Sequence, residues 1–157
     1  MTELHRSRPM TVEPAWIDYN GHLNMAYYNV LFDRGADDLF EIFGFGPDYR
    51  ERTDHTTFTG EFHVCYLREL HEGAQVHVTS QLLDFDEKRF HFFQELRHAD
   101  GWLSATGEGL GLHIDLAGPR VAPMPRSAFE AMRKMHAEHS KLPTPERAGR
   151  RIGIRRK

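Results

Sequence analysis

The sequence has little of what secreted and membrane proteins rely on. It contains a single cysteine, Cys65, so no internal disulfide can form. No segment approaches the roughly 18 consecutive apolar residues that a membrane-spanning helix needs, and residues 1–10 lack the apolar stretch of a secretory signal. We therefore expect a cytoplasmic protein that does not associate with membranes.

Familiar catalytic and cofactor motifs are missing as well. The sequence has no Gly-x-Ser-x-Gly elbow, no Walker phosphate loop and no Gly-x-Gly-x-x-Gly segment that opens a helix. Its 11 histidines are scattered, without the paired spacing of a zinc site. Cys65 fits a core residue better than a nucleophile, because no basic neighbour is evident to activate its thiol. We expect neither a metal nor a cofactor.

The formal net charge of −3 hides an uneven distribution. Residues 143–157 carry a charge of +5, so residues 1–142 carry −8. An acidic body argues against nucleic acid binding, which needs clustered Lys and Arg on the folded surface. The length fits one domain, which we place at 1–142, followed by a basic tail at 143–157. The tail is either a solvated terminus or an arm that binds an anionic ligand.

Hydrophobic periodicity predicts two helices. From Asn24 to Gly44, apolar residues recur every three to four positions with charged residues between them. Asn24 is a suitable N-cap and Gly44 a suitable stop, so this segment predicts a helix about 30 Å long. Ser127 and Glu130 have the spacing of a capping box, which predicts a final helix through about Ser140.

The remaining segments have the two-residue period of strands. We expect an opening strand over 9–19 and a meander of four antiparallel strands between 60 and 120, with a bulge near 82–83. The last strand carries alternate glycines within 107–111, and we expect the long helix to lie against them. This order indicates an α+β protein, and a curved antiparallel sheet around one helix fits it.

Four polar residues, Asp18, Asn20, His22 and Asn24, are spaced by two where an apolar strand meets the long helix. A helix N-terminus presents unpaired N–H groups and partial positive charge, which polarise a carbonyl. A carboxylate beside it can attack that carbonyl or deprotonate a water, so the arrangement suits acyl transfer. The alternative is structural: Asn20-Gly21 forms a turn, Asn24 caps the helix and Asp18 accepts hydrogen bonds from the turn.

These residues carry a resemblance to a known family. The sequence resembles hotdog-fold acyl-CoA thioesterases of the 4-hydroxybenzoyl-CoA thioesterase type over roughly 8–142, and is most similar to the betainyl-CoA thioesterases of carnitine catabolism. The resemblance rests on Asp-Tyr-Asn-Gly-His-Leu-Asn (18–24), Tyr66-Leu-Arg-Glu, Gln81-Leu-Leu and Ala105-Thr-Gly-Glu-Gly. It implies a curved antiparallel sheet of about five strands wrapped round one long central helix, plus a C-terminal helix. It also implies hydrolysis of a short polar acyl-CoA, betainyl-CoA above all, to betaine and CoA.

The resemblance assigns roles to the motif. Asp18 corresponds to the catalytic carboxylate, which acts as nucleophile or as general base for water. The backbone N–H of Met25 corresponds to the helix terminus that polarises the thioester carbonyl. His22 and Asn24 correspond to polar positions that orient the water or the carboxylate. Hotdog hydratases place their histidine differently, in an Asp-x-Asn-Pro-x-His run, so the resemblance favours hydrolysis over hydration.

Recognition of a quaternary ammonium acyl group is a further expectation. Trp16, Tyr27 and Tyr28 cluster around the motif, and aromatic faces bind such cations. The same aromatics could equally serve the core. Glu61 could add a negative charge, help catalysis or simply face solvent.

The resemblance implies an acyl-CoA ligand and a homodimer or homotetramer. Lys88 and Arg89 could meet the phosphates of CoA. In the dimer, Glu61 and His63 of one chain would approach Asp18 of its partner. Two alternatives remain open: a non-catalytic hotdog module that binds acyl-CoA, and a thioesterase for aryl- or fatty acyl-CoA.

Overall fold

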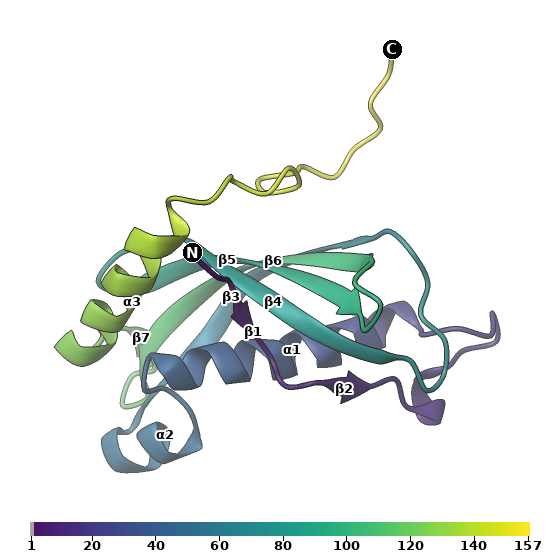
Figure 1. Cartoon of the computed structure of the whole chain (residues 1–157). Coiled ribbons are helices and arrows are strands. Elements are labelled where there is room, and N and C mark those ends of the chain that lie inside the picture. Colours follow the sequence, from purple (N-terminus) through teal and green to yellow (C-terminus); the bar gives the residue numbers. More distant parts are fainter. Residues whose placement is uncertain (1) are drawn as a thin grey trace.

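A long helix, α1, runs along one face of an antiparallel sheet in the computed structural model, which describes residues 2–157 (Figure 1). The helices are α1 (Met25–Ile42), α2 (Pro47–Thr53), α3 (Arg126–His139) and the short 3₁₀ helix η1 (Pro14–Trp16). The strands are β1 (His5–Arg6), β2 (Met10–Thr11), β3 (His55–Tyr66), β4 (Gln75–Phe85), β5 (Arg89–His98), β6 (Leu103–Asp115) and β7 (Arg120–Val121). The predicted α+β class, long helix and C-terminal helix are confirmed. Among the described helices, none is long and apolar enough to cross a membrane.

Helix α1 begins and ends where the sequence predicts. The Asn24 side chain accepts a hydrogen bond from the Ala26 N–H (2.9 Å), which satisfies one N–H that a helix start leaves free. At the other end the chain turns through Gly44, whose φ of +84° favours glycine. In the middle, Gly35 faces the sheet: a Cβ there would lie 2.7 Å from the Cβ of Val78. Glycine therefore lets the helix pack closely on β4.

The sheet has the strand order β1-β4-β5-β6-β3, with β2 also paired to β4 and β7 to β6. Helix α3 covers the rest of the β4 edge, where the Leu82 N–H donates to Nδ1 of His139 (2.9 Å). The register shift between Leu82 and Asp84 confirms the predicted bulge. At the opposite end β3 pairs only with β6, so within residues 2–157 one edge of this 12-residue strand has no partner.

The alternate glycines of β6 lie mainly beneath aromatic rings of neighbouring strands. A Cβ at Gly109 would lie 2.4 Å from the ring of Phe92, which is its partner on β5, and Gly111 faces the next ring of the same strand. Only at Gly107 does helix α1 come close, with the Phe32 ring 3.2 Å from the Cβ position. The expectation that the helix fills this face was therefore only partly right, because cross-strand rings pack over paired glycines.

The structure corrects two expectations about the strands. Residues 9–19 do not form one strand: β2 is two residues long, and η1 follows because Pro14 lacks an N–H and cannot continue a ladder. Strand β3 begins at His55, earlier than expected, and follows helix α2, which the sequence analysis did not identify. Pro47 was the available signal, since proline favours the first position of a helix.

The predicted capping box of α3 does not form. The helix starts directly after Pro125, and no side chain caps its N–H groups. Glu130 instead binds Arg133 on the next turn (2.9 Å). Proline at the boundary fixes the start of the helix, so Ser127 already lies inside it.

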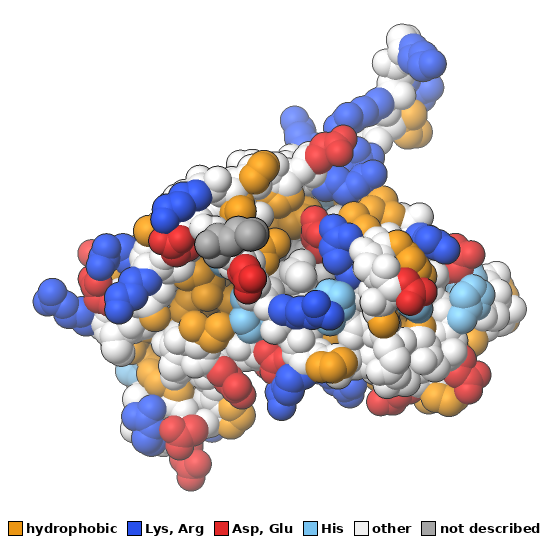
Figure 2. All heavy atoms as spheres, in the orientation of Figure 1, with side chains coloured by type: hydrophobic (Ala, Val, Ile, Leu, Met, Phe, Trp, Pro, Cys, Tyr) orange, Lys and Arg blue, Asp and Glu red, His pale blue; other side chains and the backbone are white. Residues whose placement is uncertain are grey.

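The basic tail runs over the face of the sheet opposite α1 and then projects away (Figure 1). The Gly149 N–H donates to both carboxylate oxygens of Glu108 (2.8 and 3.0 Å), and Nε2 of Gln81 donates to the Pro143 carbonyl (3.3 Å). Residues 151–157 are exposed, and Figure 2 shows Lys and Arg side chains on the projecting end. The hydrogen bonds of Gly149 and Pro143 hold the first part of the tail to the body, and the exposed Ile152 lies at the border of a cavity beside α1.

Candidate active site at the start of helix α1

The turn before α1 brings Asp18 next to the helix start. The Asp18 N–H donates to the His22 carbonyl (3.2 Å), and the Gly21 N–H donates back to the Asp18 carbonyl (3.0 Å). Gly21 has a φ of +82°, a conformation that glycine adopts without strain. The chain therefore doubles back, and Asp18 ends beside Asn24.

Both oxygens of the Asp18 carboxylate are held. Oδ1 accepts a hydrogen bond from the Asn20 N–H (2.8 Å), and Oδ2 accepts one from Nδ2 of Asn24 (3.0 Å). The Oδ1 of Asn24 accepts from the Ala26 N–H (2.9 Å). One amide side chain thus caps the helix and fixes the carboxylate at the same time. The turn and the cap of the structural alternative are both present, and the same contacts leave a half-buried carboxylate at the helix start.

The first N–H of α1 is available to a ligand. The Ala26 N–H binds the Asn24 side chain and the Tyr27 N–H binds the Asn24 carbonyl (3.0 Å), but the Met25 N–H has no partner among residues 2–157. The helix also places partial positive charge at this point. A thioester carbonyl that accepted this N–H would be polarised where its oxyanion develops.

A cavity of about 810 Å³ opens beside Met25, between α1 and the strands β3 and β5. Its lining is largely apolar and aromatic, with Asp33 as the single carboxylate and no Lys or Arg. Gln94 also lines it and is fully buried; its Nε2 donates to the Phe32 carbonyl (3.2 Å), while its Oε1 has no partner in the described part of the chain. A buried acceptor without a partner is energetically costly.

The aromatic residues predicted to bind the substrate are not all available. Trp16 is 6% exposed; its ring stacks on Tyr27 (5.9 Å between centroids), and the Arg34 guanidinium lies 5.3 Å from its centroid. Tyr28 is 4% exposed and packs edge-on against Tyr66 (4.9 Å). Two of the three predicted rings are therefore committed to the protein interior.

Tyr66 is a further residue of the site, beyond those predicted from the sequence. Its hydroxyl donates to the Met25 carbonyl (3.0 Å), and its ring lines the cavity. The signal was present, since Tyr66 ends the alternating run Phe62, Val64, Tyr66 at the end of a strand. Alternation places it in a strand but does not show its exposure, which is 43%.

Three other predicted residues do not reach the Asp18 carboxylate within the chain. The His22 ring lies edge-on to a second histidine ring, and only its backbone contacts Asp18. Glu61 and His63 lie on β3, where Nε2 of His63 is 3.9 Å from Sγ of the half-buried Cys65. Within residues 2–157, no hydrogen bond joins these side chains to that carboxylate.

Lys88 and Arg89, predicted to bind CoA, lie toward the other end of the sheet. Arg89 is seven residues along β5 from Leu96, which aligns through β6 with Tyr66, a separation of roughly 23 Å. The Arg89 side chain binds the carboxylate of Asp86 (Nε to Oδ2, 2.8 Å). A CoA thioester at Met25 of the same chain would therefore need an extended conformation to reach them.

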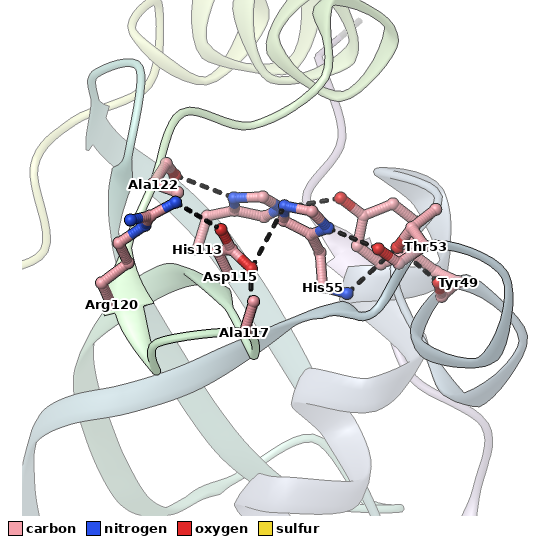
Figure 3. A network of polar contacts seen from close by, with 8 residues as sticks. All are labelled: Tyr49, Thr53, His55, His113, Asp115, Ala117, Arg120 and Ala122. Atoms are coloured by element: carbon pink, nitrogen blue, oxygen red, sulfur yellow. Dashed lines mark hydrogen bonds and ion pairs between the residues drawn. The ribbon is translucent and has the colours of Figure 1, made fainter.

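A separate polar network lies where α2 meets the sheet (Figure 3). The buried His113 donates from Nδ1 to the Ala122 carbonyl (2.8 Å), so its Nε2 accepts from the Tyr49 hydroxyl (2.7 Å). Burial lowers the pKa of His113, which favours this neutral ring. His55 stacks on it at 5.5 Å between centroids. The network joins α2 to β6 and has a structural role. In this network and throughout residues 2–157, no group of three or more His, Cys, Asp or Glu is placed to hold a metal ion.

Comparisons with known proteins agree with this geometry. The sequence matches the family model described as Thioesterase-like superfamily over residues 12–134. It is 37% identical over 155 residues to a betainyl-CoA thioesterase of Pseudomonas aeruginosa, covering 98% of each chain. It is 36% identical over 146 residues to an L-carnitine dehydrogenase/betainyl-CoA thioesterase of Rhizobium meliloti, covering 92% of this chain and 29% of that protein. A solved hypothetical protein from Staphylococcus aureus, in complex with CoA, has a TM-score of 0.90 and 30% identity, covering 99% of this chain and 98% of that one. The likeness confirms the hotdog fold.

Proposed function

The chain belongs to the thioesterase-like superfamily as an acyl-CoA thioesterase, and we propose that its substrate is betainyl-CoA, which it hydrolyses to betaine and CoA. The observation that carries the chemistry is the placement of the Asp18 carboxylate at the start of α1, where the Met25 N–H has no partner among residues 2–157 and Asn24 binds both Asp18 and the Ala26 N–H. The substrate is supported by the two relatives named for betainyl-CoA, which match 98% and 92% of this chain.

The reaction needs two groups that the helix start supplies. The thioester carbonyl oxygen accepts the Met25 N–H, so negative charge that develops on it is stabilised. Asp18 then either attacks the carbonyl carbon, forming an anhydride that water later cleaves, or takes a proton from a water that attacks directly. In both routes the C–S bond breaks, the CoA thiolate leaves and is protonated, and the acyl group departs as betaine.

Asn24 acts on the position of Asp18 rather than on the substrate. Its Nδ2 donates to the carboxylate and its Oδ1 accepts from the helix, so the distance between nucleophile and helix start is fixed by one rigid amide. Fixed placement of reacting groups lowers the entropic part of a barrier. His22 has no comparable contact, and its assigned role in orienting water stays a prediction.

We also propose that the enzyme is a homodimer joined at the open edge of β3. An unpaired strand edge of this length invites pairing with another chain. A second copy there would lie next to Glu61 and His63, which make no hydrogen bond to Asp18 within one chain, although His63 lines the cavity beside Met25. The second copy would also bring its own Lys88 and Arg89 toward the site. CoA bound at Met25 would then not need to extend along the sheet of its own chain to reach these two residues.

One observation favours larger acyl groups as a second candidate. A cavity of about 810 Å³ falls in the range that accepts drug-sized ligands, roughly 300–1,000 Å³. The betainyl group would fill only the part next to Met25. An aryl- or fatty acyl-CoA could occupy more of it.

A substrate panel decides between these candidates. Release of the CoA thiol is measured with betainyl-CoA, 4-hydroxybenzoyl-CoA and straight-chain acyl-CoAs. The proposal expects the highest kcat/KM with betainyl-CoA. A higher value with an aryl or long-chain substrate would overturn the assigned substrate but keep the enzyme class. Tight binding of every acyl-CoA without thiol release would favour a non-catalytic binding module.

A further inference from the structure

A trimethylammonium group needs an aromatic face that no other cation already occupies. The Trp16 ring does not offer one, because Tyr27 stacks on it and the Arg34 guanidinium lies 5.3 Å from its centroid. A second cation on this ring would be repelled by the arginine. Tyr28 is buried and has no face open to the cavity. Tyr27 is 37% exposed, but one face stacks on Trp16 and the residue does not line the cavity beside Met25. We therefore look for the cation site at another ring.

Tyr66 combines a fixed ring with an open surface. Its hydroxyl donates to the Met25 carbonyl (3.0 Å), and its ring packs at 86° to the ring of Tyr28, with 4.9 Å between the centroids. These two contacts hold the ring at the helix start. The residue is nevertheless 43% exposed and lines the cavity.

The reach of the substrate fits this position. In betainyl-CoA one methylene separates the thioester carbonyl from the quaternary nitrogen. A carbonyl that accepts the Met25 N–H therefore keeps the ammonium within a few ångströms of the helix start. Cation–π attraction acts within about 6 Å of a ring centroid, and the Tyr66 ring is anchored to Met25 itself.

The charge of the cavity has the right sign. Asp33 is its single carboxylate and neither Lys nor Arg lines it; His63 is the other ionisable side chain of the lining besides Tyr66. Asp33 lies roughly 12 Å along α1 from Met25, too far to contact the ammonium of so short an acyl group. Direct contact with the cation therefore falls to an aromatic ring near the helix start.

We propose that Tyr66 determines acyl specificity: its ring face binds the trimethylammonium group, and its hydroxyl positions the first turn of α1. This inference rests on the proposed function, since it takes betainyl-CoA as the substrate. The role of binding the cation, which the sequence suggested for Trp16 and Tyr28, is thereby given to a residue whose ring is both anchored and exposed.

The test compares betainyl-CoA with 3,3-dimethylbutyryl-CoA, which has the same shape but no charge. The measured quantity is the ratio of the two kcat/KM values. In Tyr66→Leu we expect this ratio to fall about 5- to 30-fold, because the cation loses its aromatic partner. Tyr66→Phe should keep most of the ratio, while kcat falls on both substrates alike because the bond to the Met25 carbonyl is lost. Val121→Ala, at an exposed apolar residue of β7 outside the cavity and the open edge of β3, should change neither value.

A set of ring-fluorinated phenylalanines at position 66 keeps the size of the side chain while weakening its negative face. The ratio should fall stepwise with each added fluorine, which a purely space-filling ring would not produce. An equal loss on both substrates in Tyr66→Leu, or a ratio that does not follow fluorination, would overturn the role of Tyr66. A wild-type enzyme that does not prefer betainyl-CoA over its neutral isostere would overturn the proposed substrate and this inference together. A wild-type preference that survives Tyr66→Leu would overturn this inference alone.

Discussion

At the scale of single residues, Asn24 is the most informative position. Its two amide atoms serve different partners: Oδ1 accepts from the Ala26 N–H and Nδ2 donates to Asp18. Capping contributes about 1 kcal/mol to stability, while the bond to Asp18 contributes to catalysis through placement. The structural and functional roles of the residue are therefore separable by substitution.

Asn24→Ser tests this separation. Serine can still accept a hydrogen bond from the helix but is too short to reach the Asp18 carboxylate. We expect a free energy of unfolding within about 0.5 kcal/mol of the wild type and a kcat lowered by about tenfold or more. Asn24→Ala, which loses both bonds, should also lose about 1 kcal/mol of stability in denaturant titration. Equal kcat values for Asn24→Ser and the wild type would show that the bond to Asp18 has no catalytic role.

Prediction from the sequence succeeded for residues whose role depends on local geometry. Asn24 as cap and Asp18 beside the helix start follow from their spacing in the chain. The aromatic residues could not be assigned in the same way, because exposure depends on what other elements cover. Trp16 is covered by Arg34 of α1, and Tyr66 is exposed within one chain because β3 is the edge strand of the sheet.

At the scale of elements, the glycines of β6 set how closely the aromatic layer can pack. At Gly111 a Cβ would lie 2.2 Å from the Phe90 ring, and at Gly109 it would lie 2.4 Å from the Phe92 ring. Each ring belongs to the residue paired with that glycine on β5. The sheet therefore buries large rings in the space that the missing side chains leave.

Gly111→Ala should be strongly destabilising. Even one methyl group would force the Phe90 ring to move, and overpacking of this kind typically costs about 1–3 kcal/mol. Gly153→Ala is the matched control, since its Cβ would meet no atom within 4 Å. The free energies of unfolding are compared by denaturant titration. Equal stability of the two variants would contradict the packing that we describe.

Helices and strands could be predicted where residues at their ends carry local signals. Features that depend on pairing between strands were predicted less well. The bounds of α1 follow from Asn24 and Gly44, and the bulge of β4 follows from its shift in alternation. The capping box at Ser127 failed because Pro125 already fixes the start of α3. The prediction that the long helix lies against the β6 glycines was only partly right, because the sequence of one strand does not show which residues of the next strand are paired with it.

At the scale of the whole molecule, buried histidines link stability to pH. Burial lowers the pKa of His77, His113 and His139 below the value of about 6.5 that histidine has in an unfolded chain. Between the two pKa values the unfolded chain binds more protons than the folded one. The free energy of unfolding is therefore highest above pH 6.5 and decreases as the pH falls below it.

We expect the Tm to be nearly constant between pH 8 and pH 7 and to fall by several degrees toward pH 5. Thermal unfolding followed by circular dichroism measures this directly. In His113→Gln the decline should be shallower, because one titrating group is removed. A Tm that rises on acidification would contradict the buried, neutral state of these rings.

The structure of the whole molecule also shows where the positive charges of the tail lie. The basic residues of the tail gather on a segment that projects from the body, while the start of the tail is held by Glu108 (Figures 1 and 2). The sequence predicts the asymmetry but not the path, because the anchor depends on a carboxylate of β6 far away in the chain. A role for the tail in CoA binding stays a prediction.

The central claim is that the Asp18 carboxylate performs the chemistry at the start of α1. It is tested most directly by the rate of CoA thiol release from betainyl-CoA in the wild type and in Asp18→Asn, with binding of CoA measured by calorimetry in both. Asp48→Asn, at an exposed carboxylate of α2, is the control. We predict that Asp18→Asn lowers kcat by about 100-fold or more while the affinity for CoA changes little, and that Asp48→Asn leaves both unchanged. A kcat for Asp18→Asn within a few-fold of the wild-type value would contradict the account.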